Sequence, residues 1–293
     1  MTPISRGLLL MIIGIAFMSA MDGVIKHLTD TISAPQVLFL RAGFGLLPIV
    51  IIAQLRTGIK DIKTKRPVVH IIRGILGSIA FIAFTMGLRD MSLANGLAVV
   101  FAAPFFMIAF SAILIGEKIG MHRIGAMIFG FIGVIIVLQP DQGILSTGAP
   151  YMLICAAGYA LSQVIARKYA NTESAVSLSF WATFGMASTG LVLSVFMWEP
   201  LNLNIILWGL AMGLTGGIAH YLMTEAARIA PPAVVSPMEY TALIWGALID
   251  WYIWQTHPET ALIIGSFFII TSGIYILWRE RVHKQESQIH EYS

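Results

Sequence analysis

The stretch IAFMSAMDGVIKHL, residues 15–28, is the second part of an apolar run that extends from Gly7 to Leu28. Because an α-helix rises about 1.5 Å per residue, a run of this length can cross the hydrocarbon core of a bilayer. The run nevertheless carries two ionisable side chains, Asp22 and Lys26. A charged group inside a membrane span costs at least about 2.5 kcal/mol and is rarely without a role. The stretch therefore predicts a membrane helix that contains a polar feature.

The composition extends this prediction to the whole chain. Of 293 residues, 57% are hydrophobic and 11% are charged, and the mean hydropathy is +0.82. Soluble domains have about 25% charged residues, so we expect an all-α integral membrane protein and read its first segment as a membrane helix, not a cleaved signal peptide.

The net charge of +3 fits basic cytoplasmic loops better than a nucleic-acid partner. The single cysteine, Cys155, is interpreted as a small buried side chain, and no Cys/His spacing predicts a metal site.

Ten segments are apolar enough to span a membrane, and short polar connections separate them. We expect spans at residues 7–27, 36–54, 69–88, 93–115, 122–139, 148–167, 176–198, 205–226, 233–253 and 260–278.

The lysine and arginine residues predict the direction of these spans. If the N-terminus is cytoplasmic, the inner loops and ends hold fourteen of the 18 basic side chains, and the outer loops hold only Arg89. Basic residues accumulate on cytoplasmic loops. We therefore expect both termini to be cytoplasmic.

Matching segments indicate that the chain contains a repeat. IGAMIFGFIGVIIVL (124–138) and IGSFFIITSGIYIL (264–277) share their glycine spacing, and FAAPFFM (101–107) corresponds to VVSPMEY (234–240) at an offset of 133 residues. These matches divide ten spans into five and five. Because five is odd, tandem copies must enter the membrane in opposite directions, which is the inverted-repeat architecture of secondary transporters. We expect repeats at residues 1–140 and 141–280, followed by a cytoplasmic tail at 281–293.

Several longer stretches resemble the EamA-domain family of the drug/metabolite transporter superfamily. They include FMSAMDGVIKHL (17–28), IGEKIGMHRIGAMIFGFIGVIIVLQP (115–140) and ARIAPPAVVSPMEYTALIWGALIDWYIWQTHPE (227–259), and the resemblance covers nearly the whole chain. It implies a ten-span bacterial inner-membrane carrier whose central cavity is built from spans one, three, four, six, eight and nine. One departure is that Thr256 stands where many relatives have a second glutamate to match Glu117.

The polar residues of the first two spans have two open interpretations. Asp22 and Lys26 share a helix face and could form an ion pair. Lys26 can also reach the interface, in which case Asp22 would pair with Arg41, which lies at a similar depth on the next span. This pair is either a structural clamp, an outer wall of the substrate cavity or a proton-sensitive latch.

A second polar group is expected nearer the cytoplasmic side. Glu239 follows Pro237, which removes a backbone donor and loosens the helix start. Arg73 and His220 are expected at a similar depth. Glu239 either faces the cavity alone, where it binds a cation or a proton, or forms a structural pair with Arg73.

The remaining candidate cavity residues are polar or aromatic side chains within predicted spans. Aromatic rings could contact a flat or cationic substrate, although packing or lipid contact is the alternative. These candidates are Phe81, Asn95, Tyr159, Gln163, Tyr240 and Trp245.

The sequence thus predicts a secondary carrier for an amino-acid-like, vitamin-like or cationic metabolite, working by export or exchange, with uptake as the alternative. We expect no cofactor, since no ATP-binding motif is present; a proton or counter-substrate would supply the energy. The protein is expected to be a monomer or homodimer in contact with lipid. A channel and a membrane enzyme are competing classes, but HYLMTE (220–225) has the wrong spacing for a zinc site.

Overall fold

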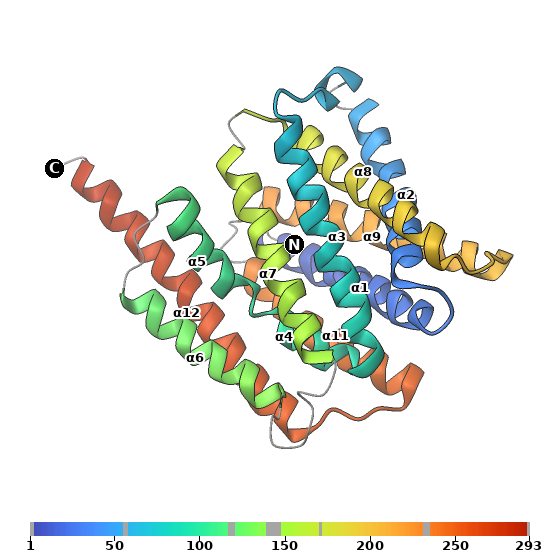
Figure 1. Ribbon diagram of the computed structural model, residues 1–293. Coiled ribbons are helices and arrows are strands. Elements are labelled where there is room, and N and C mark those ends of the chain that lie inside the picture. Colours follow the sequence, from blue (N-terminus) through green and yellow to red (C-terminus); the bar gives the residue numbers. More distant parts are fainter. Residues whose placement is uncertain are drawn as a thin grey trace.

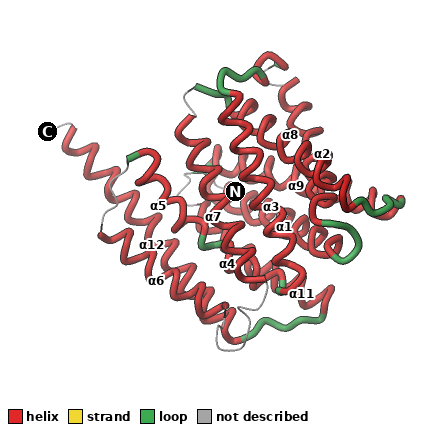
Figure 2. Tube along the Cα trace, viewed as in Figure 1, coloured by secondary structure: helices red, strands yellow, loops and turns green. Residues whose placement is uncertain are grey.

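The computed structural model describes residues 3–54, 58–116, 121–138, 148–169, 172–230 and 235–291. These residues form helices joined by short loops, with no strand among them (Figures 1 and 2). The first half contains α1 (Pro3–Thr29), α2 (Ala34–Ile52), the 3-10 helix η2 (Ile59–Ile62), α3 (Pro67–Asp90), α4 (Leu93–Val100), α5 (Ala103–Ile115) and α6 (Met121–Leu138). The second half contains α7 (Gly148–Tyr169), α8 (Ala175–Ser194), η5 (Val195–Met197), α9 (Leu203–Ile229), η6 (Ser236–Tyr240), α11 (Thr241–Trp254) and α12 (Thr260–Glu291).

The helices confirm a multi-pass membrane protein. Seven helical segments of the described chain are long and apolar enough to cross a bilayer, and shorter apolar helices cover Ile124–Leu138 and Thr260–Ile276. If α4 with α5 and η6 with α11 each count as one interrupted span, the described residues contain ten such segments. The last helix continues beyond its expected end at residue 278, as far as Glu291.

Two spans are interrupted where the sequence carries a proline. The expected span 93–115 breaks between α4 and α5, just before Pro104. The expected loosening at Pro237 is confirmed, because η6 is a 3-10 helix that precedes α11. Proline lacks an N–H donor and clashes with the preceding turn, which accounts for both breaks.

The most extensive packing joins helices from opposite halves of the sequence. The principal pairs are α1 with α9, α3 with α7, α2 with α8, and α6 with α12; the pairs α3–α8, α2–α9 and α5–α7 follow, and α4 also packs against α11. The α6–α12 pair lies along one edge of the bundle (Figure 1). The two halves are therefore interleaved, and side chains between them are inside the protein.

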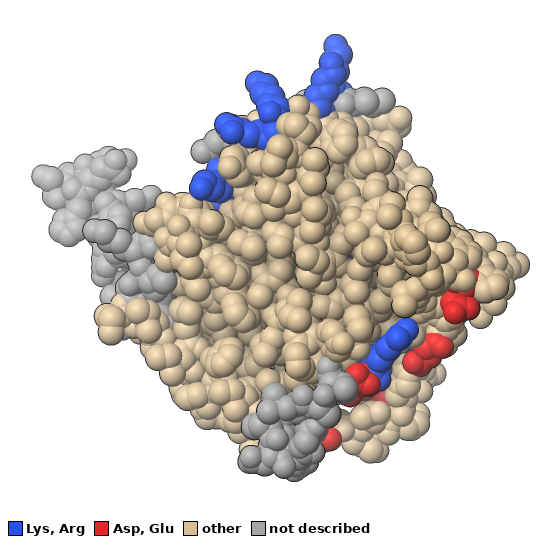
Figure 3. Space-filling model, in the orientation of Figure 1, with Lys and Arg blue, Asp and Glu red and all other residues tan. Residues whose placement is uncertain are grey.

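Charged side chains separate towards the two ends of the visible face (Figure 3). One end, which we call the basic end, carries η2 and the start of α3, with exposed Lys60, Lys63, Lys65 and Arg66. At the opposite, acidic end, α1 finishes and α4 begins. Asp30, Asp90 and Glu199 are exposed there, together with Arg89.

Candidate functional site

Asp22 and Arg41 lie near each other inside the bundle but do not touch. Asp22 on α1 is 8% exposed, and the charge of Arg41 on α2 acts on it. The expected direct ion pair is wrong, since no such contact within 4.0 Å occurs in the described residues. The Arg41 guanidinium instead lies over the Phe81 ring, 5.0 Å from its centroid, and its buried Nε has no hydrogen-bond acceptor among the described residues.

A second polar group comes from α7 and η6. The Gln163 amide donates to the Tyr159 hydroxyl at 3.2 Å, and both side chains are accessible. The Glu239 carboxylate lies close enough to the Tyr159 and Tyr240 hydroxyls to interact with them electrostatically. Glu239 is also accessible, and within the described ranges it forms no ion pair. Among the described residues, no side chain therefore neutralises a negative charge on Glu239.

Cys155 and His220 link these two groups. Asp22 and Arg41 both lie close enough to the Cys155 thiol to interact with it electrostatically. Cys155 is in turn close to Tyr159 on the same helix. His220 on α9 is accessible and close enough to Arg41 for their charges to interact. We call the resulting set the interior polar site; its members come from α1, α2, α7, α9 and η6 and are Asp22, Arg41, Cys155, Tyr159, Gln163, His220 and Glu239.

Asn95 and Trp245 have mainly local contacts. The Asn95 backbone N–H donates to the Ser92 hydroxyl at 3.2 Å, which caps α4. Trp245 is half-buried against a cluster around Met11 and Ile15, and its buried indole N–H has no acceptor in the described residues. Tyr240 packs on Phe101 with ring centroids 5.0 Å apart.

Arg73 does not join Glu239 or His220, and the alternative of an Arg73–Glu239 ion pair is not formed among the described residues. Its guanidinium donates to two backbone carbonyls, those of Leu178 at 2.8 Å and Ser162 at 3.3 Å. These carbonyls belong to α8 and α7, which pack against α3. The packing of α3 on α7 and α8 directs the Arg73 guanidinium to these carbonyls and not to Glu239.

Lys26 forms a buried ion pair that the sequence analysis missed. Its ammonium lies 2.9 Å from the Asp250 carboxylate of α11 and 4.5 Å from the centroid of the Trp254 ring. Asp250 is 2% exposed and also accepts hydrogen bonds from the backbone N–H groups of Leu93 and Ala94, at 2.9 and 2.8 Å. Asp250 therefore neutralises the charge of Lys26 within the protein.

A repeat correspondence could have identified Asp250. The offset of 133 residues that aligns Pro104 with Pro237 also aligns Glu117 with Asp250. The carboxylate that seemed to be absent at Thr256 therefore has a counterpart six residues earlier. Glu117 itself lies outside the described residues.

A third buried carboxylate lies at the basic end. Glu173 contacts His70 Nε2 at 3.2 Å, accepts from the Ser177 hydroxyl at 3.1 Å, and accepts from the Lys65 backbone N–H at 2.9 Å. Burial raises the pKa of Glu173, but the hydrogen bonds from Lys65, His70, Thr64 and Ser177 outweigh it, and the pKa is lowered. This cluster ties the loop before α3 to the start of α8.

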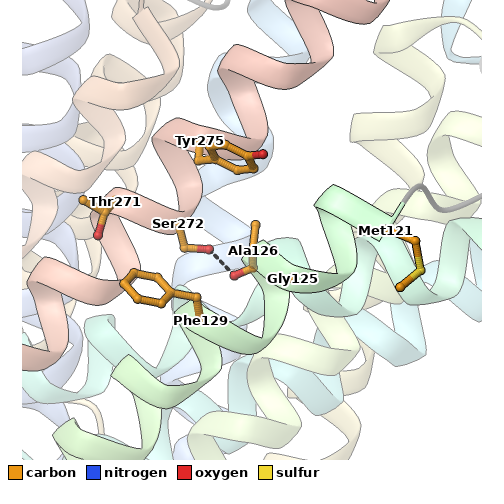
Figure 4. A pocket seen from close by; sticks show the side chains of 7 residues that line it. All are labelled: Met121, Gly125, Ala126, Phe129, Thr271, Ser272 and Tyr275. Atoms are coloured by element: carbon orange, nitrogen blue, oxygen red, sulfur yellow. Dashed lines mark hydrogen bonds between the residues drawn. The ribbon is translucent and has the colours of Figure 1, made fainter.

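The bundle also contains a hollow of about 530 Å³ between α6 and α12. Figure 4 shows Phe129 and Thr271 beside it, with the Ser272 hydroxyl donating across to the Ala126 carbonyl at 2.5 Å. Because this helix pair lies at the edge of the bundle (Figure 1), the hollow is separate from the interior polar site.

Comparisons with known proteins agree with this architecture. The sequence matches the EamA-like transporter family over residues 5–139 and again over 146–278. It is 25% identical to an S-adenosylmethionine uptake transporter of Rickettsia prowazekii, covering 98% of this chain and 96% of that protein. It is 27% identical to a riboflavin transporter of Rhizobium johnstonii, covering 91% and 89%, and 23% identical to a pseudopaline exporter of Pseudomonas aeruginosa, covering 92% and 95%.

A solved crystal structure has a similar fold, with a TM-score of 0.65 at 18% identity over 95% of this chain and 99% of that one. The family match spans both halves of the chain, and the relatives it resembles over most of their length are transporters, not enzymes. The chain therefore belongs to the EamA-like transporter family.

Proposed function

We propose that this transporter carries a small metabolite that bears both a negative and a positive group, and that the interior polar site binds it. The observation that carries the proposal is the presence of two opposite charges, Arg41 and Glu239, neither of which has an ion-pair partner within 4.0 Å among the described residues. A buried charge without a partner is costly. A ligand with complementary groups would give the buried Nε of Arg41 an acceptor and would place a cation against the accessible Glu239 carboxylate.

The surroundings favour such a ligand. Arg41 can form a bidentate contact with a carboxylate, and Glu239 can accept a cationic group. The Tyr159 and Tyr240 rings offer faces for a cation or a flat ring system. Asp22 lies close enough to Arg41 to interact with its guanidinium electrostatically, although the two side chains form no direct contact.

The names of similar transporters are consistent with this class of cargo. S-adenosylmethionine carries a carboxylate, an ammonium and a sulfonium group, so it could meet Arg41 and Glu239 at once. Both directions of transport occur among the named relatives, as uptake in the Rickettsia prowazekii protein and export in the Pseudomonas aeruginosa protein. We therefore propose export or exchange as the direction of transport, with uptake as the alternative.

We further propose that transport uses two inverted five-span repeats, at 1–140 and 141–280. The family matches each half separately, and the helix pairs support a two-fold relationship. Exchanging the halves converts the α1–α9 pair into α7–α3 and the α3–α8 pair into α9–α2, and it maps α2–α8 and α6–α12 onto themselves. Such a repeat lets the two halves exchange conformations about a fixed site near the bilayer centre.

The charge separation supports a cytoplasmic basic end, and hence cytoplasmic termini in a bacterial inner membrane. Figure 3 places basic side chains over one end and mainly acidic side chains over the other, as the positive-inside rule expects. A proton gradient or a counter-substrate would drive the cycle in a monomer or homodimer.

Thermal-shift measurements on purified protein test the cargo class. We expect S-adenosylmethionine or methionine, which carry opposite charges, to raise the melting temperature more than riboflavin, which carries none near neutral pH. Arg41→Gln and Glu239→Gln should each abolish the shift. A larger shift with riboflavin, unaffected by either substitution, would contradict the proposal.

A further inference from the structure

A network of contacts surrounds Asp250 at the acidic end of the bundle. It joins the end of α1 through Lys26, the end of α11 through Asp250 and Trp254, and the start of α4 through the Leu93 and Ala94 amides. Helices α1 and α4 come from the first half of the sequence and α11 from the second. The network therefore crosses the interface between the proposed repeats.

In the described residues, the two interrupted spans pack extensively against each other at this end but not at the other. Helix α4 packs against α11, whereas the continuation of the same span, α5, has no comparable packing on η6 or α11 in the described residues. At the basic end of this interface, Glu239 of η6 is accessible. The site thus has polar, accessible groups towards the basic end, while at the acidic end Asp22 is 8% exposed and Asp250 2% exposed.

We propose that the Lys26–Asp250 pair, with the amides of Leu93 and Ala94, is the gate that closes the pathway at the acidic end. This rests on the alternating access of the proposed function. Opening that end requires α11 to separate from α1 and α4, and every contact of the network joins α11 to one of those two helices.

The chemistry suits a reversible closure. In the closed state, the Asp250 carboxylate accepts hydrogen bonds from one ammonium and two backbone amides. Closure therefore leaves neither ion of the pair without a partner. When the helices separate, water can hydrate both ions, which lowers the cost of breaking the pair. By contrast, the Arg73 contacts end on backbone carbonyls of α7 and α8, and water cannot replace them without loosening α3 from those helices.

The native Cys155 provides a reporter for this gate. It is the only cysteine of the chain and is 7% exposed. It lies seven residues inside α7, counted from Gly148 at the acidic end. A membrane-impermeant methanethiosulfonate reagent, added outside intact cells that express the protein, should therefore reach Cys155 only when the acidic end opens.

We expect slow external labelling of Cys155 in the unmodified protein. Lys26→Met removes the ion pair but leaves Asp250 bound to both amides, and it should speed labelling about tenfold, equivalent to about 1.4 kcal/mol. Asp250→Asn weakens both kinds of contact and should speed it further. The control is Asp30→Asn, a matched loss of charge on an exposed side chain at the same end; its labelling rate should stay that of the unmodified protein.

Labelling of folded Lys26→Met and Asp250→Asn at the rate of Asp30→Asn would overturn the gate and leave the network a static contact. Failure of both variants to reach the membrane in folded form would also overturn it, because it would make the network a requirement for folding. The assay uses no substrate, so a wrong cargo assignment would not change its outcome. If the charged compounds gave no thermal shift but the variants still differed in Cys155 labelling, only the proposed cargo would be contradicted.

Discussion

At the scale of single residues, Glu239 combines accessibility with the absence of an ion-pair partner in the described chain. A carboxylate paired with Arg73 would have been a structural element, but Arg73 donates to the Ser162 and Leu178 carbonyls instead. The geometry therefore favours the interpretation in which Glu239 meets the ligand. Removing its charge should affect binding far more than folding.

For Glu239→Gln we expect the thermal stability to change by less than about 1 kcal/mol, since no ion pair is lost. Ligand affinity should fall about 10- to 100-fold, the value of a charge-assisted hydrogen bond of about 1.5–3 kcal/mol. Binding titrations and melting curves on the same sample measure both. A large loss of stability with unchanged affinity would assign Glu239 to structure.

Glu173 gives a residue-level prediction for pH dependence. Its pKa in the folded protein is lowered below the ordinary 4.5, because hydrogen bonds from Lys65, His70, Thr64 and Ser177 outweigh the effect of burial. A carboxylate with a lowered pKa stabilises the fold above its unfolded pKa, and the contribution is lost as pH falls through the folded value. The unmodified protein should therefore melt higher than Glu173→Gln at pH 7, and the difference should shrink as pH falls below 4.5.

Melting curves of both proteins between neutral and acidic pH check this expectation. The matched control is Glu199→Gln, whose side chain is exposed. A Glu173→Gln difference that grows as pH falls would show that the sign is wrong.

At the scale of elements, α6 and α12 pack through glycines. A Cβ added at Gly133 would lie 2.6 Å from the Gly265 carbonyl oxygen and 2.7 Å from Phe268 Cβ, whereas one added at Gly125 meets nothing within 4 Å. Gly133→Ala should therefore destabilise the protein by about 1–3 kcal/mol. Gly125→Ala, on the same helix, should be neutral or stabilise by up to about 1 kcal/mol, because alanine is the better helix former.

Chemical denaturation in detergent distinguishes the two alanine variants. Equal stability of both would mean that α6 and α12 do not pack this closely.

The elements also show how far the sequence determines the fold. Apolar length predicts the spans, since each must cross the same bilayer, and Pro237 predicts the 3-10 start of the ninth span. The break before Pro104 in the matching FAAPFFM segment follows from the same reasoning but was not predicted. Lys26 and Asp250 are 224 residues apart, and only the rotation of α1 against α11 brings them together. Arg41 shows the same limit, because helix rotation places it over Phe81 and not against Asp22.

At the scale of the whole molecule, the charge separation predicts the topology. In a Cys155→Ser background, Lys63→Cys at the basic end should react with an impermeant thiol reagent only in inside-out vesicles. Asp90→Cys at the acidic end should react only in intact cells. The opposite result would reverse the orientation, because both positions are exposed at opposite ends of the fold.

We propose that this family member is a carrier with an interior site for a metabolite of mixed charge. Counterflow in proteoliposomes tests it most directly, with S-adenosylmethionine, methionine or riboflavin loaded inside and a labelled trace of the same compound outside. A carrier exchanges the two pools, so internal S-adenosylmethionine or methionine should accelerate uptake of its own label, riboflavin should do so less, and Arg41→Gln and Glu239→Gln should remove the acceleration. Uptake that is indifferent to the internal load for both charged compounds, or that survives both substitutions, would contradict the account.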